Sequence, residues 1–164
     1  MRIRTLLTLA GSLALLACER QAAEQEAPAP AAEPPAAAAP EPAAMPRTPS
    51  PEGATVYFIA PLDTAEVTSP VNVVFGLKGA GVAPAGIDLP NTGHHHLLVD
   101  TELADENLPV PANAQSIHFG LGQTETTLEL PAGEHTLQLV LGDHLHRPHD
   151  PPLLSERITV TVVE

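Results

Sequence analysis

Histidine is the residue type in this chain whose number and spacing could support chemistry. All eight histidines lie after residue 93, and three are adjacent, at His94, His95 and His96. A β-strand directs alternate side chains to opposite faces, so His94 and His96 would share one face and His95 would occupy the other. Imidazoles at positions i and i+2 lie roughly 6.5–7 Å apart at Cα and can turn toward one ion about 2 Å from each nitrogen.

A second histidine group lies in a Pro-containing segment, Asp143–Asp150, that follows another apolar stretch. Neutral imidazoles in an acidic domain are common ligands of copper, zinc and nickel. The sequence therefore predicts a site for a divalent transition metal, copper or zinc, with His94 and His96 as two ligands. Two more ligands would come from His118, His144, His146 and His149. Three carboxylates would fix the imidazole tautomers, namely Asp100, Asp143 and Asp150.

The same histidines also have a metal-free interpretation. Imidazoles in loops often hydrogen-bond to backbone carbonyls, and the loops would then recognise a protein or an envelope polymer. An enzyme is not expected, because a nucleophile elbow, a phosphate loop and a dinucleotide fingerprint are all missing from the sequence. A three-histidine metal hydrolase is a minor alternative, since such a metal can activate water.

Charge and composition narrow the range of partners. The net charge is −13 with neutral histidines, and lysine and arginine together number only seven. Such a surface repels phosphate backbones, so nucleic-acid binding is not expected. Tryptophan is absent and only four residues are Phe or Tyr. The core is therefore predicted to be aliphatic.

The N-terminal residues predict a lipoprotein signal peptide over residues 1–17. A basic start precedes the apolar run Thr5–Leu16, which is shorter than the about 20 residues that a membrane-spanning helix needs. Leu15-Leu16-Ala17-Cys18 resembles the bacterial lipobox, which is cleaved before a cysteine that is then acylated. The resemblance implies a lipid anchor on Cys18 in a membrane facing the periplasm, and Glu19 favours the outer membrane. An ordinary secreted protein with a chance cysteine is the alternative.

Residues 18–53 are rich in Ala, Pro and Glu and predict a disordered, extended spacer with polyproline II character.

From residue 54 to residue 164, short apolar stretches alternate with Pro, Gly and Asp, which indicates strands and turns. The predicted strands are 55–59, 71–77, 95–99, 117–119, 126–130, 136–141 and 157–162. Seven short strands without a helical period favour an all-β, immunoglobulin-like sandwich.

That topology makes a spatial prediction for the histidines. In an immunoglobulin-type sandwich, the loop before the third strand, the loop after the sixth and the fourth-to-fifth connection lie at one end. Seven of the eight histidines would then gather at that end, and His135 would lie at the other.

The segments Asn91–Asp100, Ile117–Glu125 and Leu141–His149 resemble one family of bacterial exported proteins. The family is catalogued as domain of unknown function 4399, and the likeness extends over residues 54–164. It implies the same small β domain but no established activity. It also implies that certain residues matter, namely His94, His95, His96, His118, Gln123, Thr124, Glu125, His144, His146 and His149.

Overall fold

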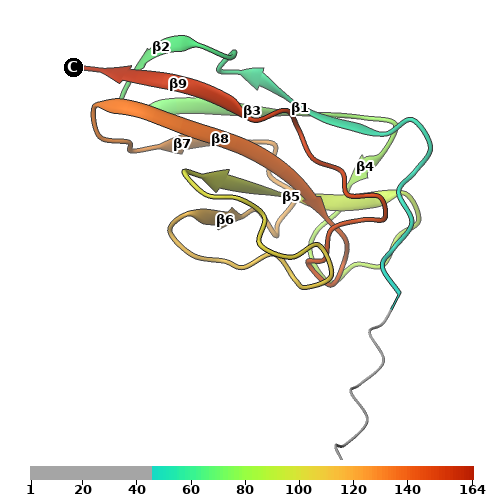
Figure 1. Cartoon of the computed structure of the whole chain (residues 1–164). Coiled ribbons are helices and arrows are strands. Elements are labelled where there is room, and N and C mark those ends of the chain that lie inside the picture. Colours follow the sequence, from blue (N-terminus) through green and yellow to red (C-terminus); the bar gives the residue numbers. More distant parts are fainter. Residues whose placement is uncertain (1–45) are drawn as a thin grey trace, which may run out of the picture. The chain divides into compact units, whose positions relative to one another are not determined.

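Alternating apolar residues build two facing β-sheets in the part of the chain that the computed structural model describes, residues 46–164 (Figure 1). This part is all-β and contains no helix. Its strands are β1 (Thr55–Ala60), β2 (Ala65–Thr68), β3 (Val71–Lys78), β4 (Gly81–Val82), β5 (Thr92–Val99), β6 (Ser116–His118), β7 (Glu125–Leu128), β8 (Gly133–Gly142) and β9 (Ile158–Val163).

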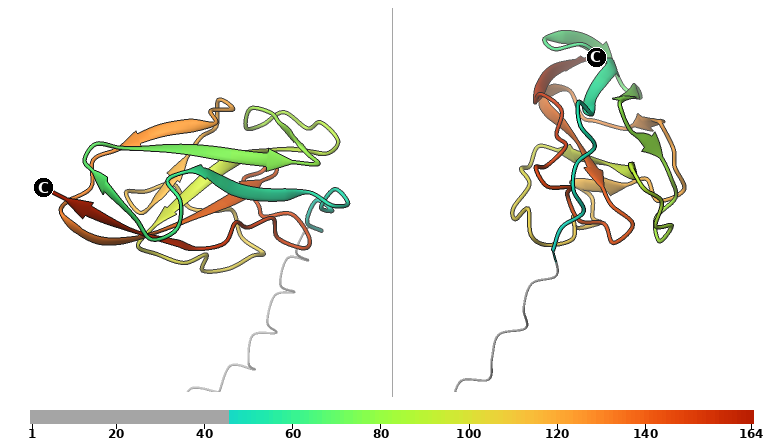
Figure 2. Two further views of the ribbon diagram at one scale, coloured as in Figure 1. Left: turned by 90° about the horizontal axis from the view of Figure 1, so that it is seen from above. Right: turned by 90° about the vertical axis from the view of Figure 1, so that its right-hand side faces the viewer.

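The strands divide into a small and a large sheet, whose course can be followed in Figure 2. The small sheet has the order β1-β3-β7, and both of its pairings are antiparallel. The large sheet has the order β2-β9-β8-β5-β4, and β6 also pairs with β5. In the large sheet, β2 runs parallel to β9 and β4 runs parallel to β5.

One aliphatic core fills the space between the sheets. The small sheet contributes Val73 and Phe75 of β3, and the large sheet contributes Leu137, Leu139 and Leu141 of β8. These residues occupy alternate positions of their strands, as the period of a strand requires. The aliphatic character predicted for the core is confirmed.

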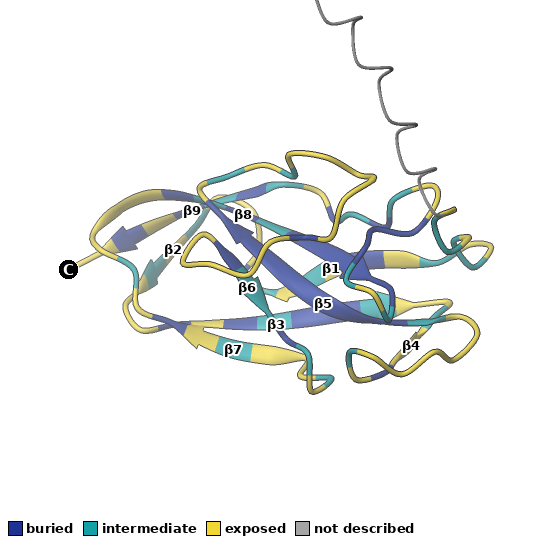
Figure 3. Ribbon diagram, turned by 90° about the horizontal axis from the view of Figure 1, so that it is seen from below, coloured by how far each residue is buried: buried dark blue, intermediate teal, exposed yellow. Residues whose placement is uncertain are grey.

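A second, smaller apolar cluster covers the outer face of the large sheet. Leu98 of β5 and Val140 of β8 pack there against Val110, which lies in the long connection between β5 and β6. Strand β5 is therefore covered on both faces, and Figure 3 shows it buried along nearly its whole length. A central strand covered on both sides favours a continuous run of buried residues over alternation.

The all-β class predicted from sequence is confirmed, but the count of seven strands is wrong. The structure adds β2, in the segment after β1, and β4, inside a stretch predicted to be a loop. Both are short parallel strands held by backbone hydrogen bonds to β9 and β5, so they carry little hydrophobic pattern of their own. In a seven-stranded immunoglobulin-like sandwich the fourth strand pairs with the fifth, whereas β6 pairs with β5 in the large sheet.

The predicted signal peptide, Cys18 and most of the predicted spacer lie outside the described residues. The end of the predicted spacer is described and is bonded to the domain. Pro49 forms a parallel bridge with Asp150, and the Thr48 hydroxyl donates a 2.7 Å hydrogen bond to the Asp143 carboxylate. Among the described residues, no helix is long and apolar enough to cross a membrane.

Replacing a core leucine of β8 should destabilise the domain. We expect Leu139→Ala, at a side chain with no exposed surface, to lower the free energy of unfolding by about 2–5 kcal/mol, because it leaves a cavity between the sheets. Urea unfolding followed by circular dichroism measures this. Leu121→Ala is the matched control, since Leu121 is 82% exposed and should change little. Equal effects of the two substitutions would contradict the assignment of the core.

Candidate metal centre

Strand register brings three histidines together on the outer face of the large sheet. His94 and His96 alternate with His95 along β5, so the first two share that face. His96 lies directly opposite His118 in the antiparallel pairing of β5 with β6. Side chains of directly opposed residues are neighbours on one face of a sheet, so β6 places the third imidazole beside the other two.

A fourth imidazole comes from the loop that follows β8. His94 is the pairing partner of Gly142, the last residue of that strand, so the loop begins next to the β5 histidines. His146 adopts a left-handed backbone conformation, with φ of 66°. Its amide donates to the Asp143 carbonyl, and its own carbonyl accepts from the Val110 amide. These bonds hold a conformation that non-glycine residues rarely adopt.

The four rings lie close together, with the widest separation, 6.1 Å, between the ring centroids of His96 and His146. The Nε2 atoms of His94 and His96 are 3.1 Å apart. The ring centroid of His118 lies 5.0 Å from that of His94 and 5.0 Å from that of His96. The ring centroid of His146 lies 5.0 Å from that of His94 and 4.8 Å from that of His118. We call His94, His96, His118 and His146 the histidine cluster.

Burial separates the members of the histidine cluster. His94 and His96 have no exposed surface, whereas His118 and His146 are partly exposed. Within the described residues, the Nδ1 atoms of His94 and His96 and the Nε2 atom of His118 are buried without a hydrogen-bond partner. An unpaired buried polar atom costs about 1–3 kcal/mol, so such a group calls for a ligand or another explanation.

Burial and mutual repulsion make these imidazoles poor bases. The pKa of His94 is lowered from 6.5 to about 4, first by burial and then by the charges of His146 and His118. The pKa of His96 is lowered to about 3 by burial and then by the charge of His94. Burial also lowers the pKa of His118. All three are therefore neutral at pH 7, the form that coordinates metals.

Two glycines make room for the rings. A Cβ atom on Gly120 would lie 2.6 Å from Nε2 of His118, and one on Gly142 would lie 3.0 Å from Nε2 of His96. Neither glycine requires a positive φ, so the close approach of the imidazoles is the constraint at both positions. Both belong to segments that carry the family resemblance, but the sequence alone does not distinguish them from turn glycines.

The remaining predicted ligands have other surroundings. His144 is separated by 3.6 Å from the carboxylate of Asp88, and Nδ1 of His149 lies 3.2 Å from the Leu141 carbonyl oxygen. The structure therefore brings His118 and His146 next to His94 and His96, which we call the β5 pair. His144 and His149 instead contact Asp88 and the Leu141 carbonyl. His95 is buried on the core side, where its ring centroid lies 5.2 Å from that of Phe75.

His135 lies near the opposite end of β8 from the histidine cluster, as predicted. Its Nδ1 lies 2.7 Å from a carboxylate oxygen of Asp100. This hydrogen bond raises the pKa of His135. Burial would raise the pKa of Asp100, but its hydrogen bonds to His135 and to the Thr136 amide lower it overall.

The predicted role of three carboxylates as acceptors for the cluster imidazoles is not what the structure shows. Asp100 bonds to His135, and Asp150 bonds to Arg47. Asp143 is buried and accepts from the Thr48 hydroxyl and from two backbone amides of its own loop. Asp143 therefore shapes the loop that carries His146. Its side chain is also bonded to Thr48, which lies in the predicted spacer, so the sequence of the Leu141–His149 segment alone does not indicate this role.

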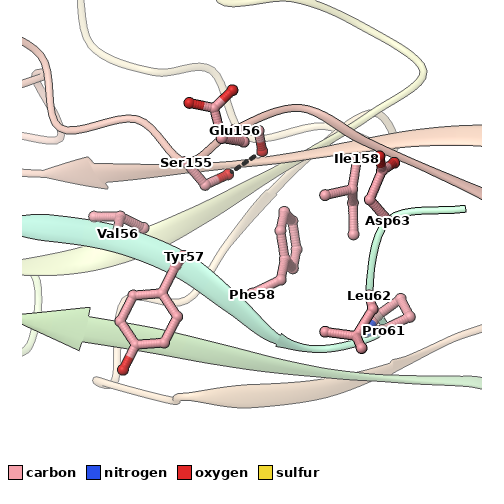
Figure 4. A pocket seen from close by; sticks show the side chains of 9 residues that line it. All are labelled: Val56, Tyr57, Phe58, Pro61, Leu62, Asp63, Ser155, Glu156 and Ile158. Atoms are coloured by element: carbon pink, nitrogen blue, oxygen red, sulfur yellow. Dashed lines mark hydrogen bonds between the residues drawn. The ribbon is translucent and has the colours of Figure 1, made fainter.

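An apolar groove lies elsewhere in the domain (Figure 4). Two of its polar groups are bonded within the protein: the Ser155 hydroxyl donates to the Glu156 carbonyl, and the Asp63 carboxylate accepts from the Thr159 amide. No histidine lines it. The histidine cluster is therefore the better candidate for a functional site.

Comparison with known proteins agrees with the resemblance seen in the sequence. The chain matches the family model described as Domain of unknown function (DUF4399) over residues 73–163. The chain belongs to the DUF4399 family. All four members of the histidine cluster lie within the matched DUF4399 range, whereas Thr48 and β1 lie before it. No curated protein and no solved structure matches the chain.

The buried imidazoles should make the DUF4399 domain sensitive to acid. His94, His95 and His96 have lowered pKa values in the folded state, so below pH about 6.5 the unfolded chain binds more protons. Stability is therefore complete above that pH and falls as the pH drops toward 4, by up to about 1.4 kcal/mol per pH unit for each imidazole. Urea midpoints at about pH 7.5 and about pH 5 measure the effect.

The variant His95→Leu provides an internal control. It replaces a core imidazole with an apolar side chain, so it should fold and show a shallower loss of stability with acid. His135 acts in the opposite direction, since its raised pKa adds stability that is lost as the pH rises above that pKa. A urea midpoint that is unchanged on acidification would contradict the burial of neutral imidazoles.

Proposed function

We propose that the domain binds a transition-metal ion, copper or zinc, through His94, His96, His118 and His146. The observation that carries the proposal is the convergence of ring nitrogens: one ligand atom each from His94, His96 and His118 lies within 4.8 Å of the others. Two of these side chains are fully buried and retain unpaired nitrogens in the described part of the molecule. His95, on the core side of β5, also has buried ring nitrogens without a partner, so the convergence of the rings and not the missing partners distinguishes the histidine cluster.

The spacing of the β5 pair suits coordination. With Nε2 atoms 3.1 Å apart and metal–nitrogen bonds of about 2.0–2.1 Å, the angle at the ion would be about 100°, between square-planar and tetrahedral values. His118 offers a third ligand atom within 4.8 Å of the other two, and the ring of His146, which contacts those of His94 and His118, would supply a fourth. His118 and His146 are partly exposed, which leaves a route for an ion to enter and leave.

The proposed role is binding and exchange of the ion and not catalysis. A hydrolase would need a metal-bound water and a group that positions a substrate. The nearest buried carboxylate, Asp143, is occupied by Thr48 and two backbone amides. We place the domain on a lipid anchor at Cys18, after a signal peptide, at the outer membrane facing the periplasm, which accords with the lipobox-like sequence.

We also propose that the domain is a variant of the immunoglobulin-like sandwich. The order β1-β3-β7 in one sheet and β9-β8-β5 in the other supports this assignment, because it follows the arrangement of strands A, B, E and G, F, C in that fold. The edge strand β6 would take the place next to β5.

Metal titration tests the proposal. Untagged protein carrying Cys18→Ala, which removes the single thiol, should bind one equivalent of Zn(II) or Cu(II) in calorimetry. The variant His94→Ala/His96→Ala should lose roughly 100-fold or more in affinity, because it removes the two buried ligands. His135→Gln/His144→Gln removes two imidazoles outside the histidine cluster and should bind as the parent does. No binding by the parent, or equal losses in both double variants, would reject the proposal.

A glycine variant tests the geometry without removing a ligand. Gly120→Ala should lower the metal affinity by about 10-fold or more, because its methyl group displaces the His118 ring. Gly76→Ala is the matched control: its methyl group would displace the Tyr57 ring on the small sheet, far from the proposed ligands in the fold. Equal affinities of the two variants, each with a native circular dichroism spectrum, would show that the position of His118 is unimportant.

A further inference from the structure

The ligands available in the histidine cluster are all uncharged. Among the described residues, the one group of possible ligand side chains close enough to share an ion consists of histidines, without a carboxylate or a thiolate. The Asp143 carboxylate accepts three hydrogen bonds, from the Thr48 hydroxyl and from the amides of Leu145 and Arg147. The ligand atoms themselves therefore bring no negative charge, and the carboxylate whose charge acts on His94 is the single one of Asp143.

The inner side of the histidine cluster, at His94 and His96, is poor in solvent. His94 and His96 have no exposed surface, and the same face of the large sheet continues into the apolar cluster of Leu98, Val110 and Val140. The charge of Asp143 can balance one positive charge, so a divalent ion would leave one unbalanced. Desolvation of an ion is costly in such a place, and its cost rises with the square of the charge. A monovalent ion would therefore incur about one quarter of the desolvation cost of a divalent ion.

We propose that the ion for which the cluster is selective is Cu(I), bound in preference to Zn(II). This inference rests on the proposed metal-binding function and specifies its ion. Cu(I) is satisfied by three neutral nitrogen ligands, so His94, His96 and His118 together form a sufficient site. Zn(II) in the same ligands would carry one positive charge more than Asp143 can balance, unless an anion entered with it.

The position of His146 allows a test in which only charge differs. Its φ of 66° is one that Asp and Asn adopt more readily than other non-glycine residues, so His146→Asp and His146→Asn both suit the backbone. The two side chains have nearly the same shape. Only the aspartate places a negative charge beside the ion.

The experiment measures the affinities of the Cys18→Ala protein for Cu(I) and Zn(II). Cu(I) is titrated without oxygen against a chromophoric Cu(I) chelator, and Zn(II) against a chromophoric zinc chelator. We expect the parent to bind Cu(I) more tightly than Zn(II) by about 100-fold or more. We expect the ratio of Zn(II) to Cu(I) affinity to be at least about tenfold higher in His146→Asp than in His146→Asn.

The outcomes distinguish the two proposals. If the parent binds Zn(II) as tightly as Cu(I) or more tightly, or if the Asp and Asn variants show the same ratio, the preference for Cu(I) is overturned while metal binding stands. If the parent binds neither ion, the proposed function falls and the preference falls with it.

Discussion

The register between β5 and its two neighbours is the constraint on which the rest of the structure depends. It sets His96 opposite Val140 on one side and opposite His118 on the other. Side chains alternate along a strand, so a shift by one residue would send His94 and His96 into the core and His95 to the outer face. Leu97 and Val99 of β5 oppose such a shift, because they must remain between the sheets with the leucines of β8. The hydrophobic core therefore determines which imidazoles meet.

The histidine cluster opposes the stability that the core provides. His94 and His96 are buried with unpaired nitrogens, and each such atom costs about 1–3 kcal/mol. The left-handed conformation of His146 adds to this cost. Without a ligand, the unpaired imidazole nitrogens and the left-handed conformation of His146 only lower the stability of the domain. Sites of this kind, where local rules of folding are broken, are where function is expected.

The loop that carries His146 shows why the candidate site extends beyond the family motif. Asp143 organises the loop through its backbone amides and is itself bonded to Thr48. Thr48 lies before the matched family range, in a segment whose Ala- and Pro-rich composition predicted a spacer. The composition of a segment predicts the conformation that the segment adopts by itself. It does not indicate that one side chain, the Thr48 hydroxyl, will bond to Asp143 in a distant loop.

The amino-acid sequence by itself determined the all-β class, the aliphatic core and the sharing of one face by His94 and His96, because all three follow from local periodicity and composition. It also identified the candidate ligands, since imidazoles can be recognised wherever they stand. It did not determine that His118 and His146, and not His144 and His149, join the β5 pair. It also missed β2, β4 and the pairing of β6 with β5. These features depend on backbone pairing between distant segments, and backbone hydrogen bonds are the same for every residue type except proline. Only the tertiary structure could decide them.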